Sequence, residues 1–404
     1  MMAVDEAPAR TPMRRLPGAT VLQIVPALVD EPAARAAVNV ASALLRSGAR
    51  ALVAGGAGML IGQLQALGGE WVQYASLTRN PIKLRGNARV LSQLIGRERI
   101  DIVHAYSAPA AWSARIAIHN TGARLVTTYA GAPTERRKLV SLYRKALTSG
   151  HRIVAESEHA ADLVIKRHKI APERIVAIPP SIDTARFDPT AVSAERMAIL
   201  RHGWGIRPGW RVILVPGRLS PARGQMTLVD AVRILVNGGM RGVAFILADD
   251  GPGDSEYAQA IVHRIEAQGI GGLVRRVGHC TDMPAAYAIA DLVVVPSIEP
   301  ATFSQTAAEA HAMAKPVIAS AIGVLPEIVL GPPRVDDDAR TGWLVNPSDP
   351  IALARALAAA LALDDSILQA TGNRARRLAE TRFSPGRVAA AALAVYASLL
   401  ENGG

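Results

Sequence analysis

Short apolar runs alternate with longer segments of helical period along most of this chain. The apolar runs are rich in Val, Ile and Leu, as strands are when helices cover both faces of their sheet. The longer segments repeat apolar residues every three or four positions, which is typical of amphipathic helices. This order predicts an α/β fold with parallel strands. The predicted strands are residues 20–25, 51–53, 100–104, 124–128, 152–155, 175–178, 212–215, 243–247, 274–277, 292–295 and 316–319.

A change in composition divides the chain near its middle. Residues 182–209 carry prolines, glycines and a charged stretch of helical pattern, and a fresh series of strands follows them. A chain of 404 residues also exceeds what one hydrophobic core usually serves. We therefore predict two doubly wound domains. Residues 1–190 form the first, residues 191–383 the second, and residues 384–404 a helix that packs back on the first.

Composition excludes several classes of protein. The single cysteine, Cys280, cannot form an internal disulfide or a cysteine metal cluster. The first fifteen residues lack the apolar run of a secretory signal, and Arg355 interrupts the longest Ala/Leu tract, so neither export nor membrane spanning is expected. These features favour a protein of the cytoplasm that needs no metal cofactor.

The formal charge of +11 predicts an anionic partner. Nucleic acid is disfavoured, because the chain shows neither a recognition motif nor basic patches interleaved with aromatic residues. A phosphorylated small molecule and an anionic lipid surface remain as candidate partners.

A glycine-containing turn with two arginines follows the strand at 212–215. Gly217 allows close approach of the backbone, and Arg218 and Arg223 flank the start of the next helix. Ligands of open α/β sheets bind beyond the carboxyl ends of the strands, and arginines pair well with phosphate oxygens. The turn therefore predicts a diphosphate site. The alternative is a surface turn with two solvated arginines.

A second polar loop follows the strand at 292–295 and leads into a helix. Ser304 and Thr306 offer hydroxyls beside the free N–H groups of the first helical turn, which favours an anion. Glu309 lies further along this helix, where a carboxylate can accept hydrogen bonds from the two hydroxyls of a ribose. The alternative is an ordinary charge on the surface of a helix.

Several motifs, in this order, give the chain a family resemblance. The chain resembles the retaining glycosyltransferases of family 4, in the branch that is similar to lipopolysaccharide and exopolysaccharide sugar transferases. The likeness is looser in the first half, where it rests on DIVHA at 101–105, VTTY at 126–129, RIVA at 152–155 and RFDP at 186–189. In the second half the motifs are PGRL at 216–219, VGH at 277–279, DMPAAY at 282–287, FSQTAAE at 303–309, KPVIA at 315–319 and TGWLV at 341–345.

The resemblance implies a GT-B fold, in which two Rossmann-like domains face each other across a cleft. It implies transfer of a hexose-type sugar from a nucleotide diphosphate sugar to a cell-envelope glycan or lipid-linked acceptor. Arg218 and Arg223 would hold the diphosphate, and Glu309 the ribose. The other residues expected at the donor site are Gly217, Phe303, Ser304, Gln305 and Thr306.

The chain departs from the family pattern where the reacting sugar is expected. Ala301 stands where the first glutamate of the E-x7-E motif belongs, and Ala130 stands where a histidine is usual. Glu31 replaces part of a Gly-Gly turn, and Arg223 replaces a lysine. Losing one oriented contact costs roughly 10²-fold in rate. The second hypothesis is therefore a catalytically silent relative that binds a nucleotide sugar or a partner transferase.

Glu299 could replace the lost carboxylate, and His104 could contact the sugar or the acceptor. Glu299 lies two residues before Ala301 in the same loop, and His104 ends a predicted strand. A histidine in that place more often makes a local hydrogen bond. Residues 134–148 combine an apolar stripe with five Lys and Arg, which suits either a helix on the inner membrane face or a helix packed on the sheet.

Overall fold

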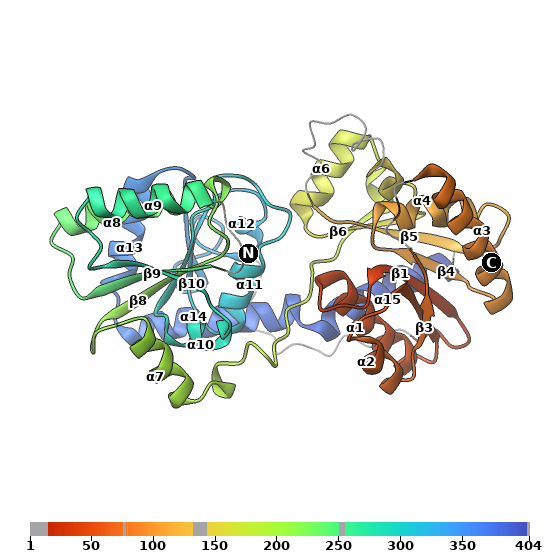
Figure 1. The fold of residues 1–404 in the computed structure, drawn as a ribbon, viewed down its shortest axis with the longest axis horizontal. Helices are drawn as coiled ribbons and strands as arrows, with labels where there is room; N and C mark the ends of the chain where they lie inside the picture. The colour runs from red at the N-terminus through yellow and green to blue at the C-terminus, as the bar shows by residue number, and fades with distance from the viewer. Residues whose placement is uncertain (1–14, 76–77, 79, 132–143, 250–254, 402–404) are drawn as a thin grey trace. The chain divides into compact units, whose positions relative to one another are not determined.

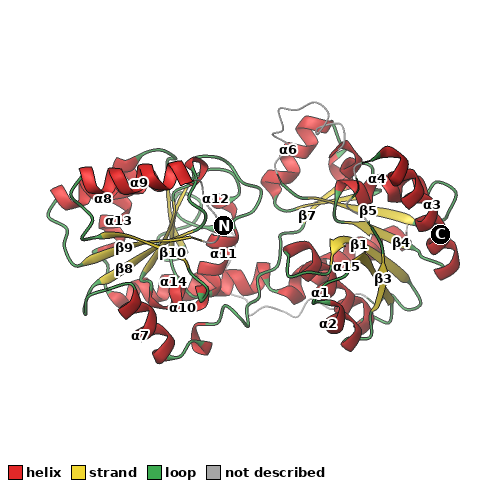
Figure 2. Ribbon diagram, viewed as in Figure 1, coloured by secondary structure: helices red, strands yellow, loops and turns green. Residues whose placement is uncertain are grey.

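The chain forms two compact units, each built around one parallel sheet (Figures 1 and 2). The computed structural model describes residues 15–75, 78, 80–131, 144–249 and 255–401. Of the described residues, those up to Ser181 and those from Pro385 onward form the N-terminal domain, and those from Ile182 to Ser384 form the C-terminal domain. The predicted α/β class with two doubly wound sheets is confirmed.

The N-terminal domain has a seven-stranded sheet in the order β3-β2-β1-β4-β5-β6-β7, with every pair of neighbours parallel. The central strands are buried on both faces, as their continuous apolar pattern predicts. The strands are β1 (Thr20–Ala27), β2 (Arg50–Gly56), β3 (Glu70–Gln73), β4 (Ile102–Ala105), β5 (Arg124–Tyr129), β6 (Arg152–Ala155) and β7 (Ile175–Ala177).

Helices cover both faces of this sheet. One face is covered mainly by α1 and α15, and the other by α3 and α4. Ser107 and Ser157 cap α4 and α6 by accepting hydrogen bonds from the N–H groups of Ala110 and Ala160. The helices are α1 (Pro32–Arg46), α2 (Ile61–Ala66), α3 (Pro81–Glu98), α4 (Ala108–Ala117), α6 (Glu158–His168) and α15 (Pro385–Glu401), with 3₁₀ turns at Lys145–Thr148 and Pro172–Arg174.

Helix α15 returns from the end of the chain to the N-terminal domain. Its residues Val388, Leu393 and Tyr396 lie in the same core cluster as Val38 and Leu44 of α1. The segment Asp365–Glu401 contains an 18-residue window that is long and apolar enough to cross a membrane, although no such window was expected, and 44% of it is buried inside the protein. Because α15 packs its apolar residues in a domain core, this packing accounts for its composition.

The C-terminal domain has a six-stranded parallel sheet in the order β10-β9-β8-β11-β12-β13. Alternate residues of its central strand point to opposite layers, with Val212 and Leu214 in one core cluster and Ile213 and Val215 in the other. Burying each such side chain stabilises the fold by about 1.5–3 kcal/mol. The strands are β8 (Arg211–Pro216), β9 (Val243–Asp249), β10 (Val274–His279), β11 (Leu292–Val295), β12 (Val317–Ser320) and β13 (Gly342–Val345).

Helices α8, α9 and α13 cover one face of the second sheet, while α10, α11 and α14 cover the other. The helices are α7 (Ala194–Gly203), α8 (Gln225–Asn237), α9 (Ser255–Ala267), α10 (Met283–Ile289), α11 (Gln305–Ala312), α12 (Leu325–Ile328), α13 (Pro350–Leu361) and α14 (Asp365–Phe383), with 3₁₀ turns at Pro189–Ala191 and Pro221–Arg223.

Strands β8 and β11 form the switch point of this sheet. After β8 the chain moves outward through β9 and β10, and it returns to pair β11 with the other edge of β8. The connections leaving β8 and β11 therefore run to opposite faces of the sheet. In open α/β sheets the ligand site lies beyond the carboxyl ends of such a strand pair.

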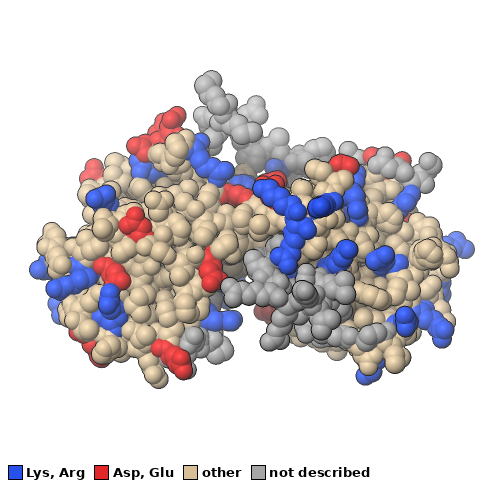
Figure 3. Space-filling model, turned by 90° about the horizontal axis from the view of Figure 1, so that it is seen from above, with Lys and Arg blue, Asp and Glu red and all other residues tan. Residues whose placement is uncertain are grey.

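The formal positive charge belongs entirely to one domain. Residues 1–181 and 385–404 contain 25 Lys and Arg against 13 Asp and Glu, a formal charge of +12. Residues 182–384 contain 20 against 21, a formal charge of −1. Figure 3 shows Lys and Arg side chains spread over the N-terminal domain on the face seen from above. An anionic partner would therefore be drawn to the N-terminal domain.

Candidate functional site

The turn after β8 is shaped by two glycines. Gly217 has φ +124°, a backbone conformation that favours glycine, and its N–H donates to the carbonyl of Ala248 at 2.9 Å. Gly224 has φ +70°, and a Cβ added there would lie 1.9 Å from the carbonyl oxygen of Pro296. The turn therefore fits closely against the chain that follows β11.

The loop after β11 ends in a capped helix. The Ser304 hydroxyl accepts a hydrogen bond from the N–H of Ala307 at 3.4 Å, so α11 begins at Gln305. Ser304 is buried, and its hydroxyl serves the helix itself. Phe303 packs edge-on against Phe383 of α14, with ring centroids 5.8 Å apart, and anchors the loop to the domain core.

These two loops meet at the switch point. The N–H groups of Ile298 and Glu299 both point to the carbonyl oxygen of Ala222, at 2.9 and 3.3 Å. Ala222 directly precedes Arg223, and the second loop leads into the helix of Glu309. The two sequence clusters that predicted a diphosphate site and a ribose site are thus joined in one region of the structure.

Arg218 and Arg223 carry the positive charge of this region. Arg218 is exposed and Arg223 is half-buried. In the part of the chain that the structure describes, neither guanidinium forms an ion pair with a carboxylate. Both are therefore available to an anionic ligand, which is what a diphosphate site requires.

The carboxylate of Glu309 is held by two neighbours. Its Oε2 lies 3.2 Å from the hydroxyl of Tyr287, and its Oε1 accepts a hydrogen bond from the Gln305 side chain at 2.9 Å. Tyr287 is fully buried in α10, and its hydroxyl also lies 3.3 Å from the carbonyl of Thr306. Glu309 is thus oriented by contacts from two helices, unlike an ordinary surface charge.

Sequence reasoning missed the role of Tyr287. The residue lies within the DMPAAY segment of the resemblance, but that segment gives no sign of where its hydroxyl points. Helices α10 and α11 flank β11 in the chain, and only their packing on one face of the sheet brings Tyr287 to Glu309.

The loop that contains Glu299 and Ala301 is tightly folded. Glu299 is exposed and takes part in the loop through its backbone N–H. The carbonyl of Ala301 accepts a hydrogen bond from the N–H of Val324 at 3.1 Å. Gly323 has φ +61°, and a Cβ added there would lie 2.8 Å from the nitrogen and the oxygen of Ala301. Among the described residues, neither α11 nor the arginine turn forms a hydrogen bond or ion pair with the Glu299 side chain.

His104, a predicted catalytic residue, lies inside the N-terminal domain. Its Nδ1 is 2.7 Å from the hydroxyl of Tyr396 in α15, and its Nε2 is 2.8 Å from the hydroxyl of Thr128. The ring stacks on Tyr106, with centroids 4.2 Å apart, and burial lowers the pKa of His104 to about 3. Because both ring nitrogens have partners within the domain, this geometry favours a packing role for His104 over a catalytic one.

The end of β5 lacks the expected histidine. The carbonyl of Ala130 accepts a hydrogen bond from Arg144, whose guanidinium lies 5.2 Å from the ring centre of Tyr129. The N–H of Gly131 donates to Glu156 at 3.1 Å. Most of the predicted basic helix at 134–148 lies outside the described residues, and its last four residues form a 3₁₀ turn.

Acidic side chains stand at the start of α1. Asp30 forms a bidentate ion pair with Arg35, and Glu31 is exposed directly before Pro32, the first residue of the helix. Two carboxylates therefore lie at the positive end of the helix dipole, where an anionic ligand would otherwise be favoured.

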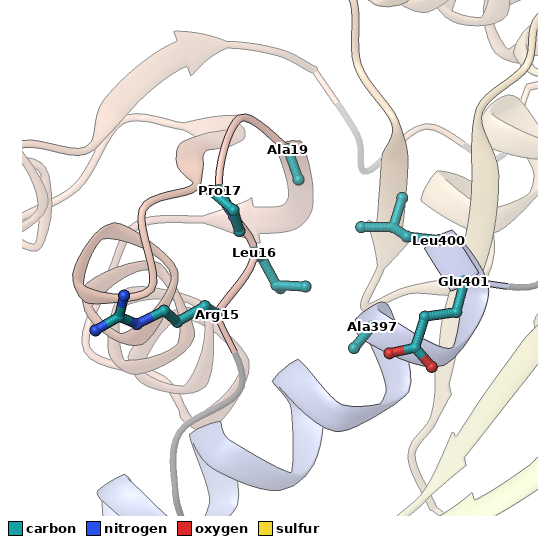
Figure 4. A pocket seen from close by; sticks show the side chains of 7 residues that line it. All are labelled: Arg15, Leu16, Pro17, Ala19, Ala397, Leu400 and Glu401. Atoms are coloured by element: carbon teal, nitrogen blue, oxygen red, sulfur yellow. The ribbon is translucent and has the colours of Figure 1, made fainter. Parts of the chain in front are cut away.

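A hollow of about 680 Å³ lies elsewhere, in the N-terminal domain (Figure 4). Its lining comes from the first described residues and from the end of α15, and none of these residues was predicted to take part in chemistry. Among the described residues, no group of three or more His, Cys, Asp or Glu is placed to hold a metal ion. The residues that line the hollow are Arg15, Leu16, Pro17, Ala19, Ala397, Leu400 and Glu401.

Both domains match family models. Residues 33–186 match the model described as Glycosyltransferase Family 4, and residues 210–363 match the model described as Glycosyl transferases group 1. A D-inositol 3-phosphate glycosyltransferase of Salinispora arenicola is 30% identical over 275 residues, which are 66% of this chain and 59% of the relative. The chain thus spans little more than half the length of the curated relatives it matches.

Solved structures share the fold over almost the whole chain. A glycosyltransferase from Rickettsia africae superposes with a TM-score of 0.81 and 26% identity, covering 95% of this chain and 99% of its own. Anabaena HepE in complex with UDP superposes with a TM-score of 0.74 and 21% identity, covering 94% of this chain and 100% of its own. The predicted GT-B fold is confirmed.

Proposed function

Since the chain carries both domains of a glycosyltransferase, we propose that it transfers a hexose-type sugar from a nucleotide diphosphate sugar, with retention of configuration, to a cell-envelope glycan or glycolipid. One observation carries the proposal. The hydrogen bonds to the carbonyl of Ala222 hold the arginine turn against the loop that leads to Glu309.

In this proposal Arg218 and Arg223 hold the diphosphate. Each guanidinium can donate two hydrogen bonds to phosphate oxygens, and both neutralise the charge that develops as the nucleoside diphosphate leaves. The bond from the sugar to the diphosphate breaks, the new bond forms to an acceptor oxygen, and the proton of that hydroxyl passes to the departing diphosphate. The two arginines balance the charge of the diphosphate without a metal ion. Gly217 lets the backbone approach the phosphates, and the start of α11, with Phe303, Ser304, Gln305 and Thr306, borders the same site.

Glu309 would bind the ribose of the donor. Its carboxylate accepts hydrogen bonds, and Tyr287 and Gln305 fix its direction, so little ordering is required when the ribose hydroxyls arrive. The Anabaena neighbours were solved with UDP and with UDP-glucose, which supports a nucleotide sugar as the donor.

The acceptor is proposed on charge and resemblance. The formal charge of +12 on the N-terminal domain suits an anionic or lipid-linked glycan, including those of lipopolysaccharide or another polysaccharide, and it suits peripheral contact with the inner membrane face. The curated relatives are D-inositol 3-phosphate glycosyltransferases, so a phosphorylated polyol belongs in the same acceptor panel. We propose no nucleic-acid partner.

A second function is favoured by the site itself. Ala130 and Ala301 cannot orient a sugar, and the Glu299 side chain is exposed. These facts favour a catalytically silent protein that binds a nucleotide sugar, or a partner transferase, as a scaffold or regulator.

One experiment separates the two functions. The purified protein is incubated with a panel of nucleotide sugars, and release of nucleoside diphosphate is followed with and without envelope extract or inositol phosphate. Release that needs an acceptor supports the transferase. Calorimetric binding without any release supports the silent binder, and the absence of both overturns the donor site.

A further inference from the structure

Helices α3 and α4 expose large apolar side chains to solvent. Ile82 and Val90 of α3 are 78% and 58% exposed, and Trp112 and Ile116 of α4 are 37% and 41% exposed. Scattered apolar residues are normal on protein surfaces, but a group on two neighbouring helices indicates an interaction site.

The two helices that carry these residues are neighbours in the N-terminal domain. They pack side by side on the same face of the N-terminal sheet (Figure 1), and the Ser113 hydroxyl donates to the carbonyl of Leu84 at 3.3 Å. Leu84 and Ser113 are buried, whereas Lys83, Arg85 and Trp112 beside them are exposed. We call the outward residues of both helices the α3–α4 surface, which comprises Ile82, Lys83, Arg85, Arg89, Val90, Trp112, Arg115 and Ile116.

The charges on this surface all have one sign. Helix α4 contains no acidic residue, and the only one in α3 is Glu98 at its last position. Glu98 already accepts hydrogen bonds from Arg50 at 2.8 Å and from Arg97 at 2.7 Å. The cations of the α3–α4 surface therefore have no carboxylate on that surface to neutralise them.

The charges and the apolar side chains of the α3–α4 surface indicate which kind of partner binds there. A second copy of this domain would bring two domains of formal charge +12 together, which like-charge repulsion disfavours. An anionic bilayer offers negative charge for the Lys and Arg of this surface and an apolar phase for its exposed apolar side chains. The indole of Trp112 and the aliphatic side chains suit the boundary between headgroups and acyl chains, while Lys and Arg reach the anionic headgroups.

We propose that the α3–α4 surface docks the N-terminal domain on an anionic lipid bilayer. This proposal deepens the peripheral membrane contact of the proposed function by naming the surface that makes it. Because α4 starts at the carboxyl end of β4, docking would place the membrane near that edge of the N-terminal sheet. A lipid-linked acceptor would then be presented close to this edge.

The test uses the full chain and vesicles of phosphatidylcholine, with and without phosphatidylglycerol. Wild type should sediment with the anionic vesicles and remain in solution with the neutral ones. Arg85→Gln with Arg89→Gln should weaken the anionic partition about 30-fold, since each cation near such a surface contributes about a factor of five. Trp112→Ser with Ile116→Ser should also weaken it, and high salt should weaken wild-type binding.

Matched controls come from the C-terminal domain. Ile199 and Ile351 are exposed apolar residues there, and Arg355 and Arg377 are exposed arginines. Ile199→Ser with Ile351→Ser, and Arg355→Gln with Arg377→Gln, should leave the partition unchanged. Quenching of tryptophan fluorescence by brominated lipid should fall in Trp112→Phe, because only a side chain inside the bilayer is quenched.

The outcomes are separable from those of the transferase test. Failure of wild type to bind anionic vesicles, or equal loss in the control variants, overturns the docking proposal. If the protein binds an acidic protein partner but no vesicles, the α3–α4 surface belongs to that partner, and the docking proposal is overturned as well. Calorimetry with nucleoside diphosphate should give the same affinity for all variants, so a failed docking test leaves the donor site standing.

Discussion

The hydroxyl of Tyr287 in α10 lies 3.2 Å from Oε2 of Glu309 in α11. We expect Tyr287→Phe to weaken binding of nucleoside diphosphate by about 1 kcal/mol, roughly fivefold, since Glu309 loses a hydrogen bond that fixes its direction. Calorimetry measures the affinity. Tyr396→Phe is the matched control, because it removes a buried tyrosine hydroxyl from the N-terminal domain and should leave the affinity unchanged.

The two arginines of the turn should contribute to donor binding through their charge. Arg218→Ala or Arg223→Ala should weaken binding of a nucleotide sugar by about 1.5–3 kcal/mol, the range for a hydrogen bond to a charged group. Binding of the free nucleoside should not change, because it has no phosphates. Arg233→Ala, an arginine on α8 away from the turn, serves as the control, and equal affinity of all three variants and wild type would remove the turn from the site.

Restoring the family residues distinguishes the two proposed functions. In a silent protein, Ala301→Glu together with Ala130→His should raise donor hydrolysis or transfer, since both changes add contacts expected at the reacting sugar. If Glu299 has taken over the lost role, wild type should already turn over and Glu299→Ala should abolish turnover. Turnover in wild type that is indifferent to Glu299→Ala would contradict both accounts.

His311 should make the protein less stable in acid. It is fully buried in α11, neither ring nitrogen has a hydrogen-bond partner among the described residues, and burial lowers its pKa to about 3. Between pH 6.5 and 3, His311 is protonated in the unfolded chain but neutral in the folded protein. Stability should therefore fall as the pH falls through this range, by up to about 1.4 kcal/mol per pH unit, and should not change above it.

His311→Met tests this by removing the titrating group. The variant should unfold with a shallower dependence on pH, and at neutral pH it should be more stable by about 1–3 kcal/mol, since two unpartnered polar atoms are no longer buried. Denaturant unfolding at several pH values measures both effects. His119→Gln, a change at an exposed histidine, should leave the pH dependence as in wild type.

The sequence by itself determined the fold class, most of the strands and the two loops that meet at the switch point of the second sheet. Buried parallel strands such as β8 and β11 are continuous apolar runs, and hydrophobicity along the chain is a local signal. The edge strands β3 and β13 were missed, because each has four residues and little buried surface to mark it. Helix α14 was missed as well.

Tertiary structure alone decided which side chains meet. His104 and Tyr396 are 292 positions apart, and their 2.7 Å contact exists only because α15 returns to the N-terminal domain. Tyr287 reaches Glu309 through the packing of two helices on one face of a sheet. Hydrophobic periodicity fixes which face of an element is buried, but it carries no information about the partner that is packed there. A pattern within the chain can therefore predict the elements and the loops, while the direction of a polar side chain depends on elements distant in sequence.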